Sequence, residues 1–576
     1  MKPLTSYFKP YLKETILGPT FKLLEAIFEL LVPMIIAMIV DQILPRGAKT
    51  QLYAMIALLF VFAILGVVVA ISAQFFSSKA AIGYTKDLTE ALFAKVLSLP
   101  KETRDRLTTS SLITRLSSDC FQIQNGINLF LRLFLRAPII VLGAIIMAYR
   151  ISPPITLIFL GLVLSLFLFV AVLTYFLNPL YLHVKRQMDR LVALTRENIL
   201  GIRVIRAFGQ SLAEQNHFIE ENQFYYKRQQ EAGYLSSLVP PVTYFLVNAS
   251  LVLVIWHGHL QIQEGFLSQG LLIALINYLL QILGELLKVT LLVSNLNQAI
   301  IAARRVQTIF DERSEDIDAP LEPHHPITSD LVLNVNHLYF TYPNSSEPAL
   351  CDLTFSIKKG ESLGIIGGTG SGKSTLLQLI QGLYTRPKEE LAIYQEATSP
   401  KSIRQWRSWI AVVPQKAELF KGTVRSNLTL GQNKDLTDET LWNAIGMARA
   451  KDFIKEDNLG LHQEVQAFGR NFSGGQSQRL TIARALVTKK AFLLLDDATS
   501  ALDYLTESKL LNEIKNLRDT NLILVSQRTR SLENLDYILV LDQGKQVGFG
   551  KHKDLLVKCP TYKEIYLSQK GGLDET

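Results

Sequence analysis

The first half of the chain contains apolar stretches that are long enough to cross a membrane. A helix that crosses about 30 Å of hydrocarbon needs about 20 mostly apolar residues. Roughly six stretches reach this length, and they cover residues 16–44, 52–76, 129–148, 155–177, 238–260 and 271–293. The composition agrees, because 48% of the residues are hydrophobic and only 19% are charged, against about 25% charged residues in soluble proteins. The sequence therefore predicts an α-helical transmembrane domain with six spans over residues 1–310.

Positive charge gathers in two long segments between the predicted spans, residues 79–125 and 180–233. Because cytoplasmic segments of membrane proteins carry an excess of Lys and Arg, we place both segments, the N-terminus and the second half of the chain in the cytoplasm. The net charge of +8 then reflects membrane topology. We expect the lipid bilayer as a partner and no nucleic acid. Residues 3–11 mix aromatic residues with lysines, which predicts a short helix at the inner membrane surface.

The two basic segments repeat apolar residues at spacings of three and four, as over residues 86–93 and 191–208. This period is typical of helices. We therefore expect the spans to continue far into the cytoplasm as helical extensions that turn near residues 108–112 and 211–220. Solvated loops are the alternative interpretation. The cysteines Cys120, Cys351 and Cys559 are too widely spaced to encode a disulfide framework or a zinc site.

An acidic stretch with several prolines, residues 311–330, is predicted to be a linker. Beyond it, over residues 331–576, short apolar strands alternate with helical stretches, which is the pattern of an α/β domain around a mainly parallel sheet. We expect strands at residues 331–335, 363–366, 410–413, 492–495, 522–525 and 537–541.

A glycine-rich loop follows the strand at 363–366 and has the pattern Gly-x4-Gly-Lys-Ser, with an apolar helix behind it. In this context the backbone N–H groups and the helix N-terminus bind phosphate. We expect Lys373 to reach the β and γ phosphates and Ser374 to bind Mg²⁺. The candidate nucleotide-binding residues of the loop are Gly367, Gly370, Ser371, Gly372, Lys373, Ser374 and Thr375. The second half is thus predicted to be an α/β P-loop nucleotide-binding domain that holds its nucleotide with Mg²⁺, and the family resemblance given below implies that this nucleotide is ATP.

Two further patterns fit the same chemistry. The strand at 492–495 ends in Asp496, at the place where P-loop folds hold the metal ion. Ser473, Gly474, Gly475 and Gln476 form a turn ahead of another helix, which would make a second anion-binding N-terminus. Alone, such a turn is most often an ordinary loop. The order of the motifs along the chain favours a second phosphate-binding surface.

Over nearly its whole length the chain resembles the ATP-binding cassette (ABC) exporters, and within them the half-transporters with six membrane helices and one nucleotide-binding domain. The resemblance implies a dimer in which the turn at 473–476 of one subunit covers the ATP held by the other subunit. It also implies that residues 108–112 and 211–220 are coupling helices. The expected location is the plasma membrane of a bacterial cell.

The resemblance assigns three more residues to the site. Tyr342 would stack on adenine, Gln415 would contact Mg²⁺ and the attacking water, and Asp503 would close a loop, residues 500–503, that joins the two sites. The alternative interpretations are a core tyrosine, a turn glutamine and a helix-capping aspartate.

The sequence departs from the family pattern at the catalytic positions. Asp497 stands where the family has the glutamate that orients the attacking water, and its carboxylate is one methylene shorter. A misplacement of about 1 Å can cost about 100-fold in rate. Gln527 stands where the family has a histidine at the γ-phosphate, and glutamine cannot carry a positive charge. Residues 465–469 also differ from the family's Gly-Glu-Arg-Gly type of loop.

Both losses affect one ATP, whereas the turn at 473–476 is intact. We therefore hypothesise a heterodimer in which this chain's own site hydrolyses slowly or not at all, and its turn completes the hydrolytic site of a second ABC half-transporter. An active homodimer that tolerates Asp497 and Gln527 is the alternative. The expected activity is ATP-driven export of hydrophobic or amphipathic small molecules, as in multidrug exporters. A flippase for lipids or lipid-linked molecules, and an ATP-gated channel or regulatory subunit, remain the alternatives.

Charged residues inside membrane spans are candidates for function. Glu25 and Glu29 lie one turn apart in the first span, and Arg132 and Arg136 one turn apart in the third. The acidic pair could attract lipophilic cations, or the four residues could form a ladder between the two spans, which we favour. Glu285 and Lys288 are predicted to pair within one helix.

Overall fold

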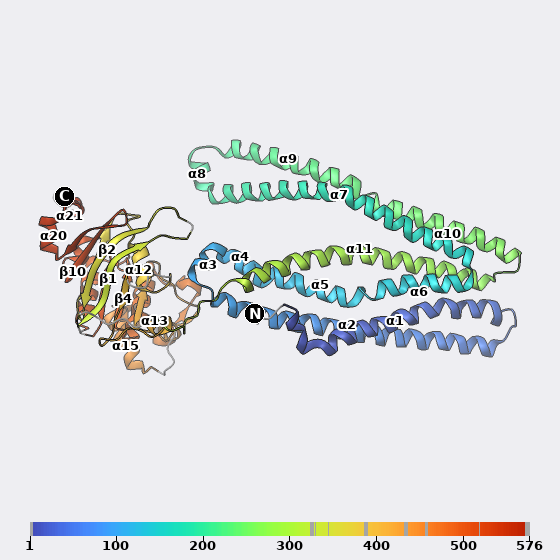
Figure 1. Ribbon diagram of the computed structural model, residues 1–576, viewed down its shortest axis with the longest axis horizontal. Coiled ribbons are helices and arrows are strands. Elements are labelled where there is room, and N and C mark those ends of the chain that lie inside the picture. The colour runs from blue at the N-terminus through green and yellow to red at the C-terminus, as the bar shows by residue number, and fades with distance from the viewer. Residues whose placement is uncertain are drawn as a thin grey trace. The chain divides into compact units, whose positions relative to one another are not determined.

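The computed structural model describes residues 4–322, 328, 330–343, 345–384, 390–430, 436–455, 459–517 and 519–570. The chain divides into two compact units. One contains residues 1–96 and 110–311, and the other contains residues 97–109 and 312–576 (Figure 1). A short piece of the first half, residues 97–109, therefore packs with the second half of the chain.

The described residues of the first unit fold almost entirely into helices. In chain order these are η1 (Leu4–Tyr11), α1 (Leu12–Met38), η2 (Ile39–Ile43), α2 (Lys49–Leu97), α4 (Thr109–Thr114), η3 (Arg115–Asp119), α5 (Cys120–Leu133), α6 (Arg136–Ile151), α7 (Pro153–Leu200), α8 (Ile202–Ala207), α9 (Ser211–Ser236), α10 (Val239–Gln263) and α11 (Gln269–Asp311).

Within the part of the chain that the structure describes, six helical stretches are long and apolar enough to cross a membrane, and each contains or overlaps one predicted span. They are Leu4–Ile43, Lys49–Leu97, Thr109–Ile151, Pro153–Leu200, Ser211–Gln263 and Gln269–Leu286. In α2, only 6% of the most apolar window is buried, as expected of a surface that faces lipid. The prediction of six spans with helical extensions is confirmed, and the interpretation of the basic segments as loops is wrong.

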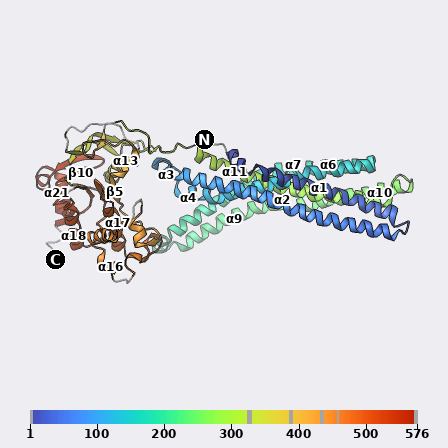
Figure 2. The ribbon, with the colours of Figure 1, turned by 90° about the horizontal axis from the view of Figure 1, so that it is seen from below.

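Both predicted turns lie too late in the sequence. The first connection is made by residues 98–100 and the short helix α3 (Lys101–Leu107), and Thr109 already begins the returning helix. Thr108 ends α3 because its φ of 59° is incompatible with a right-handed helix. The second connection runs from Gly201 through α8 to Gln210, with Gly209 at a φ of 65°. Residues 211–220 therefore belong to α9, which lies side by side with α7 in Figures 1 and 2.

Small residues and ion pairs join the helices of the first unit. A Cβ at Gly126 of α5 would lie 2.2 Å from the Ala299 Cβ of α11, so close packing there requires glycine. Nearby, the Arg305 guanidinium donates to both carboxylate oxygens of Asp119 at 2.8 and 2.5 Å. The Asp119 side chain is 1% exposed, so this pair fixes α11 to the N-terminal end of α5.

The second unit is built on a nine-stranded sheet with the order β4-β1-β2-β11-β10-β3-β9-β8-β5. Its strands are β1 (Leu331–Phe340), β2 (Leu350–Lys358), β3 (Leu363–Gly367), β4 (Leu391–Ile393), β5 (Ile410–Val413), β8 (Phe492–Asp496), β9 (Asn521–Val525), β10 (Tyr537–Asp542) and β11 (Lys545–Gly550), and β6 (Gly422–Thr423) pairs separately with β7 (Glu464–Val465). The run β10-β3-β9-β8-β5 is parallel. All six predicted strands exist. The antiparallel pairs β1–β2, β1–β4 and β10–β11 and the parallel pair β2–β11 complete the sheet.

Helices surround this sheet. They are α12 (Lys373–Ile380), α13 (Ile403–Ser408), α14 (Val424–Leu428), α15 (Asp438–Met447), α16 (Lys451–Lys455), α17 (Gly474–Val487), α18 (Tyr504–Lys515), α19 (Thr529–Leu532), α20 (His552–Lys558) and α21 (Pro560–Lys570), with short 3-10 turns η4 (Gly460–His462) and η5 (Ala467–Gly469). Two buried hydrophobic clusters lie on the two faces of the sheet, because β3, β8 and β9 carry apolar residues at successive positions. This parallel core brings the carboxyl ends of β3, β8 and β9 to one edge.

The predicted linker is ordered where the structure describes it. Glu315 binds the Arg407 guanidinium at 2.6 and 3.0 Å, and Asp318 binds Arg404 at 2.6 and 2.8 Å. The Leu321 N–H also donates to the Lys401 carbonyl. Residues 312–322 thus lie along α13, whereas residues 323–327 and 329 are outside the described part.

Candidate nucleotide-binding site

The phosphate-loop candidate connects β3 to α12. Gly370 and Gly372 have φ values of 81° and 95°, which side-chain-bearing residues rarely adopt. A Cβ at Gly372 would also lie 2.5 Å from Leu350 Cδ2. The Lys373 ammonium donates to the Gly367 and Gly368 carbonyls at 2.8 and 2.6 Å, so the loop closes around its own lysine. Burial lowers the Lys373 pKa, while the charges of Asp497 and Asp496 raise it.

A cavity of about 610 Å³ opens at this loop. Its lining contains most of the predicted loop residues together with residues that sequence reasoning missed. The lining residues are Tyr342, Glu347, Pro348, Ala349, Gly370, Ser371, Gly372, Lys373, Ser374, Thr375, Gln543 and Gly544. Gln543 and Gly544 form the hairpin between β10 and β11, and the sequence marks them only as a turn. They reach the cavity because β10 pairs with β3 in the sheet.

Tyr342 lines the cavity at the start of α12. Its hydroxyl shares a 3.0 Å hydrogen bond with the Thr375 hydroxyl. The centroid of its ring lies 5.0 Å from that of the Phe340 ring and 5.4 Å from that of the Tyr384 ring. The ring is therefore fixed on one side by other aromatic rings while the cavity lies beside it. This placement suits an aromatic that stacks on a planar base.

Two carboxylates stand at the carboxyl end of β8. Burial and the charge of Asp497 raise the pKa of Asp496, which Lys373 partly offsets. Burial also raises the pKa of Asp497, opposed by a hydrogen bond from Gln415. Carboxylate oxygens and a serine hydroxyl are ligands that Mg²⁺ accepts. A bound divalent cation would stabilise the ionised form of two adjacent carboxyls whose pKa values are raised. The residue types of Asp496 and Ser374 therefore fit the predicted metal site.

The three predicted catalytic residues meet at Asp497. Its φ is 48°, and its N–H donates to the Val525 carbonyl over 3.0 Å. The Gln415 amide donates to the Asp497 carboxylate at 3.5 Å, and Gln527 follows Val525 by two residues. The structure thus brings Gln415, Asp497 and Gln527 together from three separate segments.

The turn at 473–476 is formed, and it lies apart from this cavity. The Ser473 hydroxyl accepts from the Gln476 N–H at 3.3 Å, and the Gln476 side chain accepts from the Ser473 N–H at 2.8 Å, which is a capping box at the start of α17. At Gly474 a Cβ would meet no atom within 4 Å, whereas at Gly475 it would lie 3.1 Å from the Ala501 carbonyl oxygen. None of these four residues lines the described cavity. Within one chain, the turn is free to serve another ligand.

Asp503 caps α18. Its side chain accepts from the Thr506 N–H at 2.9 Å, and this bond lowers the Asp503 pKa. The helix-capping interpretation therefore describes its contacts within one chain. Arg528 donates to the Ser500 and Leu502 carbonyls at 3.0 and 3.3 Å, which connects the loop at 500–503 to the segment of Gln527.

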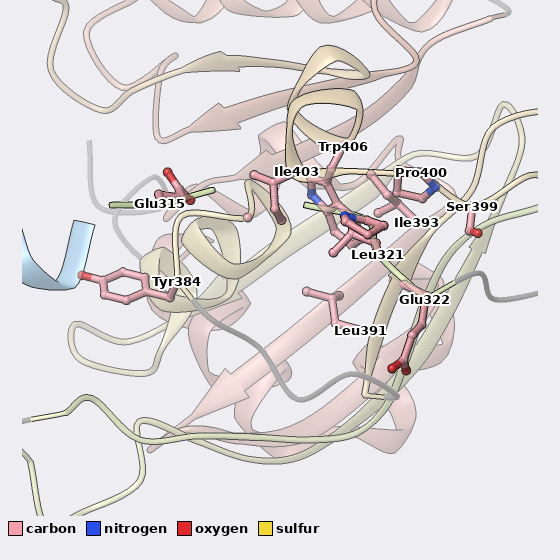
Figure 3. Close-up of a pocket in the computed structure, with 13 residues that line it drawn as sticks. Glu315, Leu321, Glu322, Tyr384, Leu391, Ile393, Ser399, Pro400, Ile403 and Trp406 are labelled. Carbon is pink, nitrogen blue, oxygen red and sulfur yellow. The ribbon is translucent and has the colours of Figure 1, made fainter. Parts of the chain in front are cut away.

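A second cavity, of about 330 Å³, lies under the linker and is separate from the phosphate loop. Figure 3 shows Trp406 above it and Tyr384 at one end, with the tyrosine hydroxyl directed toward α3. That hydroxyl donates to the Asp105 carboxylate at 2.7 Å. Asp105 of α3 therefore contacts Tyr384, which is one of the two aromatic residues packed against Tyr342.

The loop at 465–469, which departs from the family pattern, exposes an aromatic ring. Phe468 has a φ of 61° and is 74% exposed, and its N–H donates to the Leu419 carbonyl. This loop thus presents an aromatic side chain to solvent.

In the first unit, the charged residues of the spans form a network around Arg136. Its guanidinium lies 3.5 Å from Glu25, 2.7 Å from Glu29 and 3.4 Å from Glu285. The predicted pair of Glu285 and Lys288 is present at 2.8 Å. The predicted ladder of ion pairs is therefore present at Arg136, and through Glu285 it extends to α11. Arg132 is not part of it, and its Nε is buried with no hydrogen-bond partner among the described residues.

Comparison with known proteins agrees over nearly the whole chain. Residues 15–286 match the family model of the ABC transporter transmembrane region, and residues 350–500 match that of the ABC transporter. An uncharacterized ABC transporter ATP-binding protein of Mycobacterium tuberculosis is 33% identical over 98% of this chain and 97% of its own length. The uncharacterized ABC transporter ATP-binding protein YfiB of Bacillus subtilis is 31% identical over 99% of both chains. A solved bacterial Atm1-family ABC exporter with ATP bound shares the fold, with a TM-score of 0.78 at 22% identity over 97% of this chain and 99% of that one.

Proposed function

The chain belongs to the ABC transporter family as an exporter with one transmembrane domain and one ATP-binding domain, and from this membership we propose that it is the slowly hydrolysing half of a heterodimer. It is a multi-pass protein of the plasma membrane, and its ATPase domain uses ATP with Mg²⁺ to drive export. We propose that its N-terminus and its ATP-binding domain lie in the cytoplasm. The proposed cargo is a hydrophobic or amphipathic small molecule.

One observation carries the proposal of a slow site. Asp497 and Gln527, the two departures from the family pattern, follow the neighbouring parallel strands β8 and β9 at the same edge of the sheet. The Asp497 carboxylate already accepts a hydrogen bond from the Gln415 amide at 3.5 Å, and it is one methylene shorter than the family's glutamate. It therefore reaches less far toward a water at the γ-phosphate. A loss of about 100-fold in rate is the expected size of such a misplacement.

The chain's residues divide the work in the proposed mechanism. Lys373 leaves the Gly367 and Gly368 carbonyls and neutralises phosphate charge, while Tyr342 receives the base. Asp496 and Ser374 would hold Mg²⁺, which neutralises charge on the phosphate oxygens when it is bound. Asp497 orients water poorly, and Gln527 offers a hydrogen bond without a positive charge. The cassette then stays closed around ATP for longer than a cassette with glutamate and histidine would.

The intact turn supports the other half of the proposal. Ser473 and Gln476 pre-form the start of α17, whose N-terminus attracts negative charge. In the proposed heterodimer this turn completes the site on the second half-transporter, which supplies glutamate and histidine. Hydrolysis there resets the transporter.

The charges in the spans favour an uncharged contact surface for the cargo. Arg136 already contacts Glu25, Glu29 and Glu285, so these carboxylates attract cations less than an unpaired acidic face would. We therefore propose a structural role for the network and recognition of the cargo through apolar surface.

The ATPase activity of the purified chain alone, compared with that of Asp497→Glu/Gln527→His, tests the slow site. We expect the double variant to turn over at least about tenfold faster. Brisk turnover by the unmodified chain would overturn the heterodimer in favour of an active homodimer. In vesicles, uphill movement of a fluorescent hydrophobic dye supports export. Movement of labelled lipid alone would indicate a flippase, and an ATP-linked current would indicate a channel.

A further inference from the structure

Glu507 is a buried carboxylate without a role in the mechanism described above. It lies in the first turn of α18, and its side chain is 3% exposed. One oxygen accepts from the Arg528 guanidinium at 3.2 Å, and the other accepts from the Ser531 hydroxyl at 2.7 Å. Both partners belong to the segment that follows β9. Because a buried carboxylate is costly without partners, Glu507 and this segment depend on each other.

The Arg528 guanidinium connects two loops. Besides Glu507, it donates to the Leu502 carbonyl at 3.3 Å and to the Ser500 carbonyl at 3.0 Å. Its planar group carries five N–H donors in a fixed geometry, so these acceptors hold it in one orientation. Arg528 directly follows Gln527, the predicted catalytic residue just beyond the end of β9. One side chain thus joins the catalytic segment of this chain to the loop at 500–503.

The rest of the catalytic segment is held independently. The Gln569 amide of α21 donates to the Gln527 carbonyl at 2.7 Å and accepts from the Thr529 N–H at 2.9 Å. The Ser526 N–H donates to the Ile365 carbonyl. Loss of the Glu507 charge would therefore release the Arg528 side chain, 47% of which is exposed, and leave the backbone of the segment in place.

We propose that Glu507 is a positioning residue that holds Arg528 against the carbonyls of the 500–503 loop, so that the catalytic segment at Gln527 and this loop move together. The inference rests on the proposed function, in which that loop meets the second site of the dimer. It goes further by naming the side chains through which the slow site of this chain controls hydrolysis at the site of its partner.

Two variants and a matched control test the role. Glu507→Gln keeps the size of the side chain and removes its charge. Arg528→Lys keeps a charge but cannot reach Glu507 and two carbonyls together. Glu513→Gln changes the same residue type on the same helix, at an exposed pair with Arg449 at 3.0 Å. All three variants are made in the full-length chain. Each is assembled with the partner subunit in lipid nanodiscs, or is studied as the homodimer if the chain hydrolyses ATP alone.

Steady-state ATP hydrolysis is the readout. We expect Glu507→Gln and Arg528→Lys each to lower kcat about tenfold, with the KM for ATP within about twofold of the unmodified complex, because neither residue touches nucleotide. Glu513→Gln should change neither constant. The double variant Glu507→Gln/Arg528→Lys should be no slower than either single variant, since both break the same link.

Three results would overturn the inference. Glu507→Gln could turn over as fast as Glu513→Gln, the two single effects could multiply in the double variant, or kcat could fall only together with the melting temperature, which would indicate a purely structural role. Failure of the proposed function has a different signature. It would appear as brisk hydrolysis by the unmodified chain alone, before any substitution is made at Glu507.

Discussion

The backbone N–H of Asp497 donates a hydrogen bond to the Val525 carbonyl at 3.0 Å. This contact joins the ends of β8 and β9, which are neighbours in the parallel sheet, and it brings Asp497 and Gln527, 30 positions apart in the sequence, to the same edge. In the proposed function, these are the two positions at which the chain departs from the catalytic pattern of the ABC exporters. Both departures are then expected to act on the same reaction.

This arrangement predicts a rescue in two steps. Asp497→Glu alone should raise ATP turnover by less than the full amount, because Gln527 still lacks the charge of histidine. Adding Gln527→His should complete the gain of about tenfold or more. Phosphate release by the purified chain measures the effect, and Asp497→Asn is the control that should abolish the remaining activity. Equal turnover of all four proteins would contradict the assignment of Asp497.

The raised pKa values of Asp496 and Asp497 predict a conflict between stability and function. A carboxyl whose pKa is higher in the folded state binds more protons when folded, so its ionisation destabilises the fold as pH rises above about 4. Asp496→Asn should therefore raise the melting temperature of the nucleotide-free protein at pH 7.5 and have little effect near pH 4. The same variant should lose the stabilisation that Mg²⁺ with ATP gives the unmodified protein. A thermal-shift series over pH checks both signs, and a lower melting temperature at pH 7.5 would contradict the prediction.

The glycines of the phosphate loop predict a backbone effect. Gly372→Ala should weaken nucleotide binding and cost about 1–3 kcal/mol of stability, because φ is 95° and the new Cβ would meet Leu350 at 2.5 Å. The matched control is Gly446→Ala in α15, where a Cβ meets no atom within 4 Å. Helix propensity there should stabilise the protein by about 1 kcal/mol. Fluorescent-ATP titration and thermal melts of both variants distinguish the two outcomes.

The network in the spans predicts unequal roles for two neighbouring arginines. Arg136→Ala would leave Glu25, Glu29 and Glu285 without their shared partner, and breaking a buried ion pair from one side costs about 3–5 kcal/mol. We expect loss of the monodisperse protein in detergent chromatography, whereas Arg132→Ala should remain well folded.

Glu25→Gln/Glu29→Gln separates structure from cargo binding in the same network. Poor yield supports the structural role. A double variant that is well folded and has lost only the efflux of lipophilic cations would contradict the structural role. It would indicate that Glu25 and Glu29 bind the cargo.

The sequence predicted the elements whose signals are local. The spans follow from the length of apolar runs, and α12 and its phosphate loop follow from glycines and a lysine at fixed spacing. Both predicted connections between long helices begin 10 residues too late, at residues 108 and 211 where the structure has 98 and 201, because helical periodicity continues on both sides of each turn. Thr108 and Gly209 end or reverse the chain there through their backbone angles of 59° and 65°, and Thr108 carries no sequence signal for such a conformation.

By itself, therefore, the sequence determined that this protein crosses a membrane six times and binds a nucleotide, since both depend on residues close together in the chain. Only the tertiary structure decided which distant residues meet. It placed Gln543 and Gly544 at the nucleotide cavity, joined Arg136 to Glu285, and gave Arg528 the carbonyls of the 500–503 loop. Strand order and helix packing set these contacts, and the spacing of residues within a single motif predicts neither of them.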